Sequence, residues 1–345
     1  MLAKQPPGVY GEFAPWRDAS TEEVLAKIAS GEDCVIRLRA PYTHGERKTY
    51  PDLIRGDVTT QAPFVDTVLL KSDGFPTYHL AHLVDDWLMG TTHIIRADEW
   101  LASVPLHITL FEQAGLIPPY YAHIAPLLKS EDGKKRKLSK RKDPEADVRD
   151  LLARGYAPGG ILSYLMTILD PNYEAWQNEH PESDVRDFHI DLEGLNNSGA
   201  LVDEEKMRQV NREYLARLSR DELYDEAFAW ASNHDADLFT LLEKGGDYIR
   251  DALNIERHTE KDPKRYVLYT DIYDQIAFFD DGIWGQRMVD VVWPEEFDRD
   301  FVATLLADYA DRYDPSMDVE QWFDDLKEFG QGYGFAVNNA QFKEG

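Results

Sequence analysis

The chain has 345 residues and carries 37 Lys and Arg against 64 Asp and Glu, which gives a formal net charge of −27. Such an acidic surface repels polyanions, which argues against binding of DNA, RNA or an anionic membrane by bulk charge. The single cysteine, Cys34, excludes an internal disulfide and a zinc site built on cysteines. No signal peptide and no run of about 18 apolar residues is present, so we expect a cytoplasmic protein without a membrane span.

The first 62 residues predict a small mixed subdomain rather than a complete core. The apolar spacing of EEVLAKIA predicts a helix over 22–29 with Ser20 or Thr21 as its cap. The segment CVIRLR at 34–39 predicts a strand. Prolines and glycines between 40 and 66 leave room for two further short strands.

Residues 63–126 alternate between strand and helix signals. Strands are predicted at 66–71, 92–96 and 120–125, and helices at 78–89 and 103–115. This alternation predicts a parallel sheet with right-handed crossovers. A doubly wound sheet usually has about five or six strands and binds ligands at their carboxyl ends, so we predict half of a nucleotide-binding domain.

A basic loop follows the last of these strands. The run KSEDGKKRKLSKRK, residues 129–142, has eight Lys or Arg and two acids, a net charge of +6. A solvated lysine-rich turn and a nuclear-localisation signal are the simple alternatives. However, Lys137 and Lys140 stand three apart around Ser139, a small hydroxyl, and this order favours phosphate binding at the end of the sheet. The remainder of the chain has helical periodicity.

Polar side chains on the helix at 78–89 indicate a binding site. Tyr78, His82 and Asp85 are spaced to project from one helix face, and Arg96 ends the following strand. These groups suit a small substrate with a carboxylate, because Arg makes a planar two-bond fork to it. The alternative is that His82 is an ordinary packed histidine and that Arg96 pairs with a neighbouring acid, Asp98 or Glu99.

Three blocks together resemble bacterial glutamate–tRNA ligases, which are class I aminoacyl-tRNA synthetases. The blocks are LLKSDGFPTYHLAHLVDDWLMGTTHIIRADEWLASVPLH, YAHIAPLL and KLSKRKDPEA, in that order within residues 69–146. KLSKR stands where class I enzymes carry their second signature, a Lys-x-Ser-Lys loop. Three blocks at the right separations make the resemblance specific, and it extends more faintly from Tyr10 to about residue 200.

The resemblance implies an α/β plus all-α fold. It would be the second half of a class I Rossmann-like nucleotide-binding domain followed by a helical stem-contact and anticodon-binding region. The expected domains are the remainder of an acceptor-binding insertion at 1–62, the half nucleotide-binding domain at 63–126, the signature loop with the stem-contact region at 127–200, and an incomplete anticodon-binding region at 201–345.

The resemblance also assigns roles to residues. Lys137, Ser139 and Lys140 would form the catalytic loop that stabilises the leaving pyrophosphate of ATP, a task shared with Mg²⁺. ATP would further contact Leu127, Leu128 and Glu99. Glutamate would be bound by Tyr78, His82 and Arg96, with Arg96 on its side-chain carboxylate. The expected partners are glutamate, ATP and tRNA(Glu), and no zinc held by the protein is expected.

The first class I signature, His-x-Gly-His, does not occur in this sequence. We therefore expect an incomplete chain that does not charge tRNA on its own, with the missing half encoded upstream or supplied by another chain. One alternative is a non-catalytic tRNA-binding protein derived from such a ligase. Another is a related ligase that glutamylates a modified tRNA base, although enzymes of that kind lack the long helical region that follows here.

Overall fold

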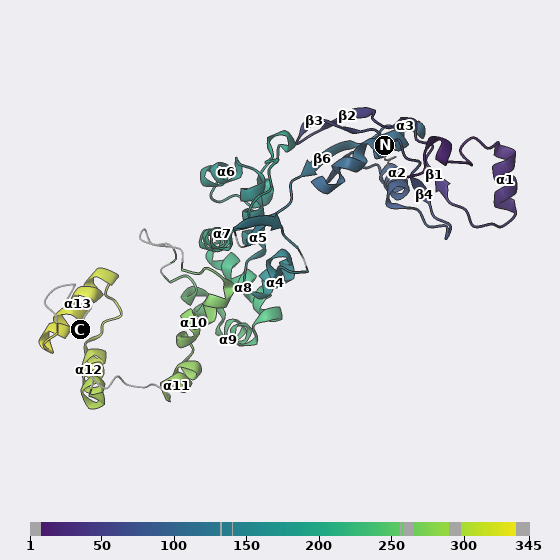
Figure 1. Cartoon of the computed structure of the whole chain (residues 1–345). Helices are drawn as coiled ribbons and strands as arrows, with labels where there is room; N and C mark the ends of the chain where they lie inside the picture. Colours follow the sequence, from purple (N-terminus) through teal and green to yellow (C-terminus); the bar gives the residue numbers. More distant parts are fainter. Residues whose placement is uncertain are drawn as a thin grey trace. The chain divides into compact units, whose positions relative to one another are not determined.

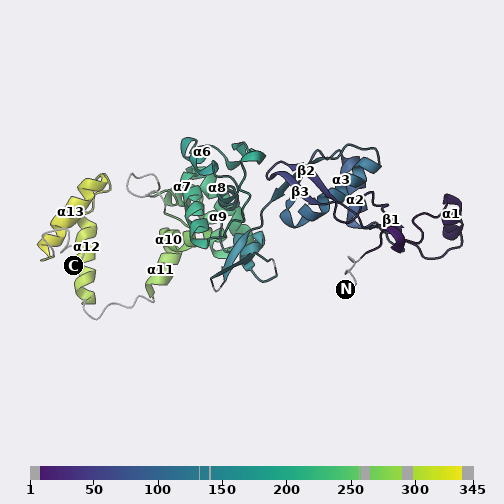
Figure 2. The same ribbon diagram turned by 45° about the horizontal axis from the view of Figure 1, so that its top comes forward.

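A computed structural model of the chain describes residues 8–131, 133–139, 141–255, 257, 265–289 and 298–335. The chain forms two compact units, Met1–Ala277 and Phe278–Gly345. In the described residues, strands occur only before residue 138 and helices dominate from there on (Figures 1 and 2). This arrangement confirms the predicted α/β plus all-α fold class.

The N-terminal elements are held by local hydrogen bonds. Helix α1 spans Thr21–Ala29 and begins with a capping box, in which Ser20 Oγ accepts from the Glu23 N–H at 3.2 Å and the Glu23 carboxylate accepts from the Ser20 N–H at 2.8 Å. Strands β2 (Arg47–Asp52) and β3 (Gly56–Gln61) form an antiparallel hairpin. The expected helix and its Ser20 cap are therefore present, as are two strands between 40 and 66.

The strand predicted at 66–71 is present, but its expected place in the parallel sheet is wrong. It forms β4 (Val68–Leu70), which pairs antiparallel with β1 (Ile36–Arg37). The chain turns back directly after β4, since Thr77 Oγ1 donates to the Val68 carbonyl at 2.9 Å. Strand β4 therefore pairs with β1 rather than with β5 or β6, and the apolar pattern of a short strand does not distinguish these partners.

The parallel part of the fold consists of β5 (His93–Ala97) and β6 (Tyr120–Ile124), in register from His93 opposite Tyr120 to Ala97 opposite Ile124. Helix α3 (Val104–Gln113) connects them, and helix α2 (Tyr78–Met89) precedes β5. The crossover was predicted and is confirmed. One core cluster joins the β2–β3 hairpin to this region, with buried members Tyr50, Val104, Ile108 and Tyr121.

The basic loop contains an antiparallel hairpin that the periodicity did not reveal. Strand β7 (Leu128–Glu131) pairs with β8 (Lys134–Lys137). The sequence between them is Asp132-Gly133, and Gly133 has a φ of +74°. Asp-Gly between two strands is the typical signal for a two-residue hairpin turn, so the hairpin was detectable in the sequence.

The helical part of the first unit follows the hairpin. Its α-helices are α4 (Val148–Ala153), α5 (Pro158–Leu169), α6 (Tyr173–Glu179), α7 (Glu204–Arg217), α8 (Arg220–His234), α9 (Ala236–Ala252) and α10 (Ile272–Ile276). Helices α5 and α7 meet at Gly160, where a Cβ would lie 2.1 Å from Asn211 Oδ1. That same oxygen accepts from the Ala157 N–H at 2.9 Å, which ties the start of α5 to α7.

The second unit contains α11 (Asp281–Val289), α12 (Arg299–Arg312) and α13 (Val319–Gly332). Helices α12 and α13 are joined by Arg312, which pairs with Asp325 at 2.6 Å and Glu328 at 2.8 Å. None of the helices in the described parts of either unit combines the length and the apolar character that crossing a bilayer demands.

Helix α7 depends on an N-cap that can be tested. Asp203 accepts hydrogen bonds from the Glu205 N–H at 2.9 Å and the Lys206 N–H at 3.1 Å. Replacing Asp203 by Ala is expected to lower the free energy of unfolding by about 1 kcal/mol, since two backbone donors lose their acceptor. Urea titration followed by tryptophan fluorescence measures this. Asp203→Asn should stay close to the parent, and an equal loss in both variants would contradict a capping role.

Candidate functional site

The predicted substrate residues meet where the first turn of α2 approaches the carboxyl end of β5. The Arg96 guanidinium reaches the Tyr78 hydroxyl at 3.3 Å, and the rings of Tyr78 and His82 stack with centroids 5.9 Å apart. The structure thus brings Tyr78, His82 and Arg96 together. Asp85, expected on the same face, is exposed, and the carboxylate beside His82 is that of Asp86, 2.6 Å from Nδ1. Asp86 stands four residues after His82, a spacing at which helix side chains are neighbours.

His82 is buried and both of its ring nitrogens have protein partners. Nδ1 faces Asp86, and Nε2 lies 3.0 Å from the Tyr121 hydroxyl. Burial lowers the pKa of His82, although Asp86 acts in the opposite direction. The packed-histidine alternative therefore describes its surroundings well, and a direct contact between His82 and glutamate stays a prediction.

Arg96 lies among groups that accept hydrogen bonds without carrying charge. Its Nε donates to His123 Nε2 at 3.1 Å, and both terminal nitrogens lie 3.3 Å from His107 Nδ1. The guanidinium carbon is 5.2 Å from the ring centroid of Tyr121 and 5.8 Å from that of Trp100. These distances allow cation–π attraction, which holds the guanidinium without neutralising it.

Arg96 does not pair with either neighbouring acid, Asp98 or Glu99, in the structure. Asp98 pairs instead with Arg55 at 3.3 Å, and Glu99 pairs with Lys137. Within the described parts of the chain, no Asp or Glu forms an ion pair with Arg96. A guanidinium in a half-buried site without a counter-ion is suited to bind an anionic ligand.

A row of imidazoles extends from Arg96 to the surface of α2. Because His107 Nδ1 accepts from Arg96, its Nε2 carries the proton and donates to His79 Nδ1 at 2.9 Å. Burial, together with the charges of His82 and Arg96, lowers the pKa of His107 to about 2. The ring is thus neutral at physiological pH. The described residues hold no group of three or more His, Cys, Asp or Glu arranged to bind a metal ion.

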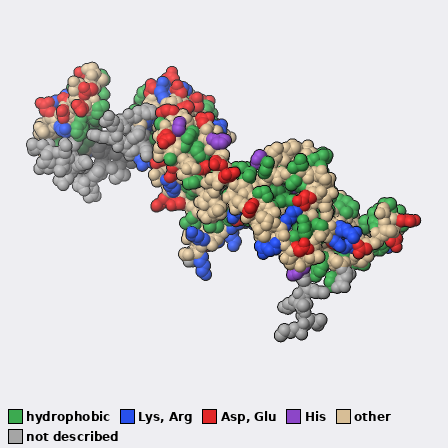
Figure 3. Space-filling model, turned by 90° about the horizontal axis from the view of Figure 1, so that it is seen from above, with side chains coloured by type: hydrophobic (Ala, Val, Ile, Leu, Met, Phe, Trp, Pro, Cys, Tyr) green, Lys and Arg blue, Asp and Glu red, His purple; other side chains and the backbone are tan. Residues whose placement is uncertain are grey.

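The signature segment forms the end of the β7–β8 hairpin. Asp143 is buried and holds Arg136 with two bonds of 2.7 Å, and it also accepts from the Ser139 N–H at 2.8 Å. Lys137 forms an ion pair with Glu99, so two predicted ATP-binding residues are in contact. Lys140 lies outside the described residues. Figure 3 shows a projection of the surface on which Lys and Arg side chains gather.

Leu127 and Leu128 are half-buried at the root of this hairpin. The Leu127 carbonyl accepts from the Leu138 N–H at 2.8 Å, which closes the hairpin. Leu128 donates to the Ala200 carbonyl and accepts from the Val202 N–H, both at 2.8 Å. The structure therefore positions these two residues beside the signature loop, and their contact with adenine stays a prediction.

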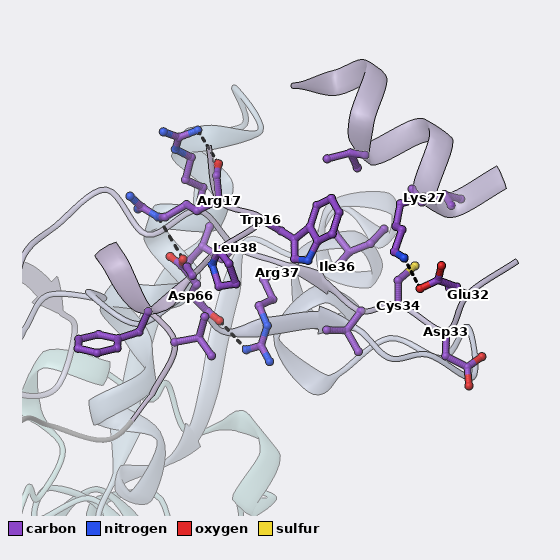
Figure 4. A pocket seen from close by; sticks show the side chains of 18 residues that line it. Trp16, Arg17, Lys27, Glu32, Asp33, Cys34, Ile36, Arg37, Leu38 and Asp66 are labelled. Carbon is purple, nitrogen blue, oxygen red and sulfur yellow. Dashed lines mark hydrogen bonds and ion pairs between the residues drawn. The ribbon is translucent and has the colours of Figure 1, made fainter. Parts of the chain in front are cut away.

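A separate cavity of about 640 Å³ lies between α1 and β1 (Figure 4). Trp16 and Ile36 lie together in its wall, and two ion pairs border it. Lys27 pairs with Glu32, and Arg17 pairs with Asp66 at 3.1 Å. This cavity contains none of the predicted site residues, and its chemistry does not point to a reaction.

Three residues around Arg96 were missed by the sequence reasoning: Asp52, His107 and His123. They lie on β2, α3 and β6 and come together only through the tertiary fold. One signal was present in the sequence, because His107 and His123 occupy interior positions of segments that otherwise read as apolar. A polar side chain at such a position needs a partner, and Arg96 provides it.

Comparison with known proteins identifies the relatives of this chain. Residues 14–186 match the family described as tRNA synthetases class I (E and Q), catalytic domain. The glutamate–tRNA ligase of Clostridium perfringens is 35% identical over 345 residues, which is 100% of this chain and 62% of that protein. The glutamate–tRNA ligase of Clostridium beijerinckii is 37% identical over 341 residues, covering 98% of this chain and 61% of that protein.

Solved structures give the same picture of the fold. A glutamate tRNA ligase from Elizabethkingia meningosepticum in complex with its amino acid has a TM-score of 0.62 at 24% identity, over 92% of this chain and 62% of that one. The glutamate–tRNA synthetase of Elizabethkingia anophelis has a TM-score of 0.61 at 26% identity over the same shares. The chain thus spans about 62% of the length of the relatives that it matches. Together with the predicted blocks, these matches establish that the chain belongs to the class I tRNA synthetases (E and Q).

Proposed function

We propose that this chain carries the glutamate-binding residues and the phosphate-binding loop of a glutamate–tRNA ligase. Such an enzyme activates glutamate with ATP and transfers it to tRNA(Glu). The observation that carries the proposal is the guanidinium of Arg96, which lies at the carboxyl end of a parallel strand. Its hydrogen-bond partners among the described residues are uncharged. The names of the relatives point to the same substrate.

Arg96 would bind the side-chain carboxylate of glutamate. Its terminal nitrogens contact Tyr78 and His107 at 3.3 Å, which is long for hydrogen bonds from a charged donor. A carboxylate could replace these contacts with two shorter parallel bonds. Tyr78, whose side chain is partly exposed, would then donate its hydroxyl to the same group.

Lys137 and Lys140 would act on the phosphates. In the first step the α-carboxylate of glutamate attacks the α-phosphorus of ATP, the bond to the bridging oxygen breaks, and pyrophosphate leaves with the added negative charge. Magnesium accompanies ATP as part of this substrate and stabilises that charge together with the lysines. The terminal adenosine hydroxyl of tRNA then attacks the mixed anhydride and releases AMP. Lys137 would exchange Glu99 for a phosphate oxygen, because both are anionic oxygen ligands.

Ligand selectivity tests the proposal. The purified chain should bind L-glutamate at least about 100-fold more tightly than L-glutamine, because the neutral amide leaves the Arg96 charge unpaired. L-Aspartate, which is one methylene shorter, should also bind weakly. Calorimetric titration, supported by saturation-transfer NMR, measures all three. Equal affinity for glutamate and glutamine would refute the proposal and favour the alternative of a non-catalytic tRNA-binding protein.

A further inference from the structure

A buried carboxylate and an imidazole lie next to the Nε atom of Arg96. Asp52 is the last residue of β2, and its side chain is fully buried together with that of His123 on β6. Asp52 Oδ2 lies 2.5 Å from His123 Nδ1, and His123 Nε2 lies 3.1 Å from Arg96 Nε. Three side chains from three strands therefore form one continuous row.

The hydrogen-bond partners fix every proton along this row. Asp52 Oδ1 accepts from the backbone N–H groups of Ile54 at 3.1 Å and Arg55 at 3.0 Å. Burial alone would raise the pKa of Asp52, but the bonds from His123 and from these backbone groups outweigh it and lower the pKa. The carboxylate can then only accept, so His123 Nδ1 carries the proton. In the neutral ring, Nε2 is left as the acceptor that Arg96 Nε requires.

The same row restricts how the guanidinium can turn. Nε is occupied by a fully buried acceptor, and the ring of Tyr121, parallel to that of His123 within 11°, lies under the guanidinium. Rotation about the last side-chain bonds of Arg96 would break the bond to His123. The two terminal nitrogens are consequently held toward His107 Nδ1 and the Tyr78 hydroxyl, where their planar fork is available to a carboxylate that replaces these long contacts.

We propose that Asp52 and His123 are positioning residues that orient the Arg96 guanidinium for a substrate carboxylate. Asp52 acts through His123 by setting its tautomer, and His123 acts on Arg96 directly. The proposal deepens the proposed function and rests on it, because it assumes that Arg96 binds the side-chain carboxylate of glutamate. It also gives the β2–β3 hairpin, which contributes none of the predicted site residues, a role in substrate selection.

Two substitutions of His123 separate positioning from mere structural support. In His123→Asn the amide nitrogen falls near the place of Nδ1, so the bond to Asp52 is kept and the acceptor for Arg96 is lost. In His123→Gln the amide oxygen falls near the place of Nε2, so Arg96 keeps an acceptor and Asp52 loses its donor. His93→Asn, at an exposed histidine on β5, is the matched control.

We expect opposite rankings for binding and stability. His123→Asn should weaken L-glutamate binding about 10-fold or more, because a hydrogen bond to a charged group is lost, whereas His123→Gln should stay within about 3-fold of the parent. His123→Gln should have the lower melting temperature, because it leaves a buried carboxylate without its donor. If binding and melting temperature fall in the same order across both variants, the positioning role is refuted.

NMR of the unsubstituted ¹⁵N-labelled chain provides a test that requires neither variant to fold. His123 should be protonated at Nδ1 and unprotonated at Nε2 near neutral pH, and the Arg96 Nε–H should exchange slowly with water. Protonation at Nε2, or fast exchange of that Nε–H, would overturn the proposal whether or not glutamate binds. If both signals are as expected and glutamate does not bind, the positioning of Arg96 stands and the proposed function fails.

Discussion

Replacing Arg96 by Gln is expected to weaken binding of L-glutamate by about 100-fold or more. Glutamine offers neither the positive charge nor the two parallel N–H donors that hold a carboxylate. Removing one member of a buried charged pair typically costs about 2 to 5 kcal/mol, and 2.7 kcal/mol corresponds to about 100-fold in affinity. Calorimetric titration of the variant and the parent chain with L-glutamate measures the difference.

Two further substitutions test whether the loss of glutamate affinity comes from the charge and planar fork of Arg96. Arg96→Lys keeps the charge without the planar fork and should give an intermediate affinity. Arg47→Gln removes an exposed guanidinium on β2 whose hydrogen bond, within the described part of the chain, goes to the Thr59 carbonyl, and this variant should bind glutamate as the parent does. An Arg96→Gln variant with the affinity of the parent would show that the substrate carboxylate binds elsewhere.

Mild acid is expected to destabilise the fold through its neutral histidines. His107 is fully buried, and burial with the neighbouring charges of His82 and Arg96 lowers its pKa from the ordinary 6.5 to about 2. Below pH 6.5, His107 binds a proton in the unfolded chain but not in the folded chain. The contribution of neutral His107 to the free energy of unfolding is therefore fully present above pH 6.5 and falls as the pH is lowered. His107 alone should remove about 1.4 kcal/mol per pH unit, or roughly 2 kcal/mol between pH 6.5 and 5.

Urea titrations at pH 7 and pH 5 measure this loss. Burial also lowers the pKa values of His79 and His82, which adds to the loss in the same direction. His107→Gln should reduce the difference between the two pH values, since its amide does not titrate. His93→Gln, at an exposed site, should leave the difference as large as in the parent. An equal pH dependence in both variants would assign the acid sensitivity to other groups.

Local sequence signals predicted most elements of this fold. Apolar spacing and a capping serine were sufficient for α1, and the alternation of strand and helix was sufficient for α2, β5, α3 and β6. The partner of β4 was not predictable in the same way. A run such as VLL has the same composition whether its neighbour is parallel or antiparallel, and the neighbour chosen here, β1, lies more than thirty residues earlier.

The candidate site was predicted in part, for a related reason. Tyr78, His82 and Arg96 lie close together in the sequence, on a helix and the strand that follows it. The chemistry of these side chains indicated a ligand with a carboxylate. Asp52 and His123 are separated by 71 residues and meet only because β2 packs against β6. Contacts of this kind depend on tertiary packing, so residue spacing and secondary-structure propensity do not predict them.

The root of the β7–β8 hairpin bears on the entropy of the proposed nucleotide binding. Leu128 is bonded on both sides to the segment that leads into α7, and a Cβ at Gly199 would lie 2.8 Å from Leu128 Cδ1, so the two chains are in close contact. Asp143 closes the other end by bonding to Ser139. Ordering a free residue costs about 1 to 2 kcal/mol of backbone entropy. Both ends are already ordered in the folded chain, so the proposed binding of phosphates at this loop does not have to order them again.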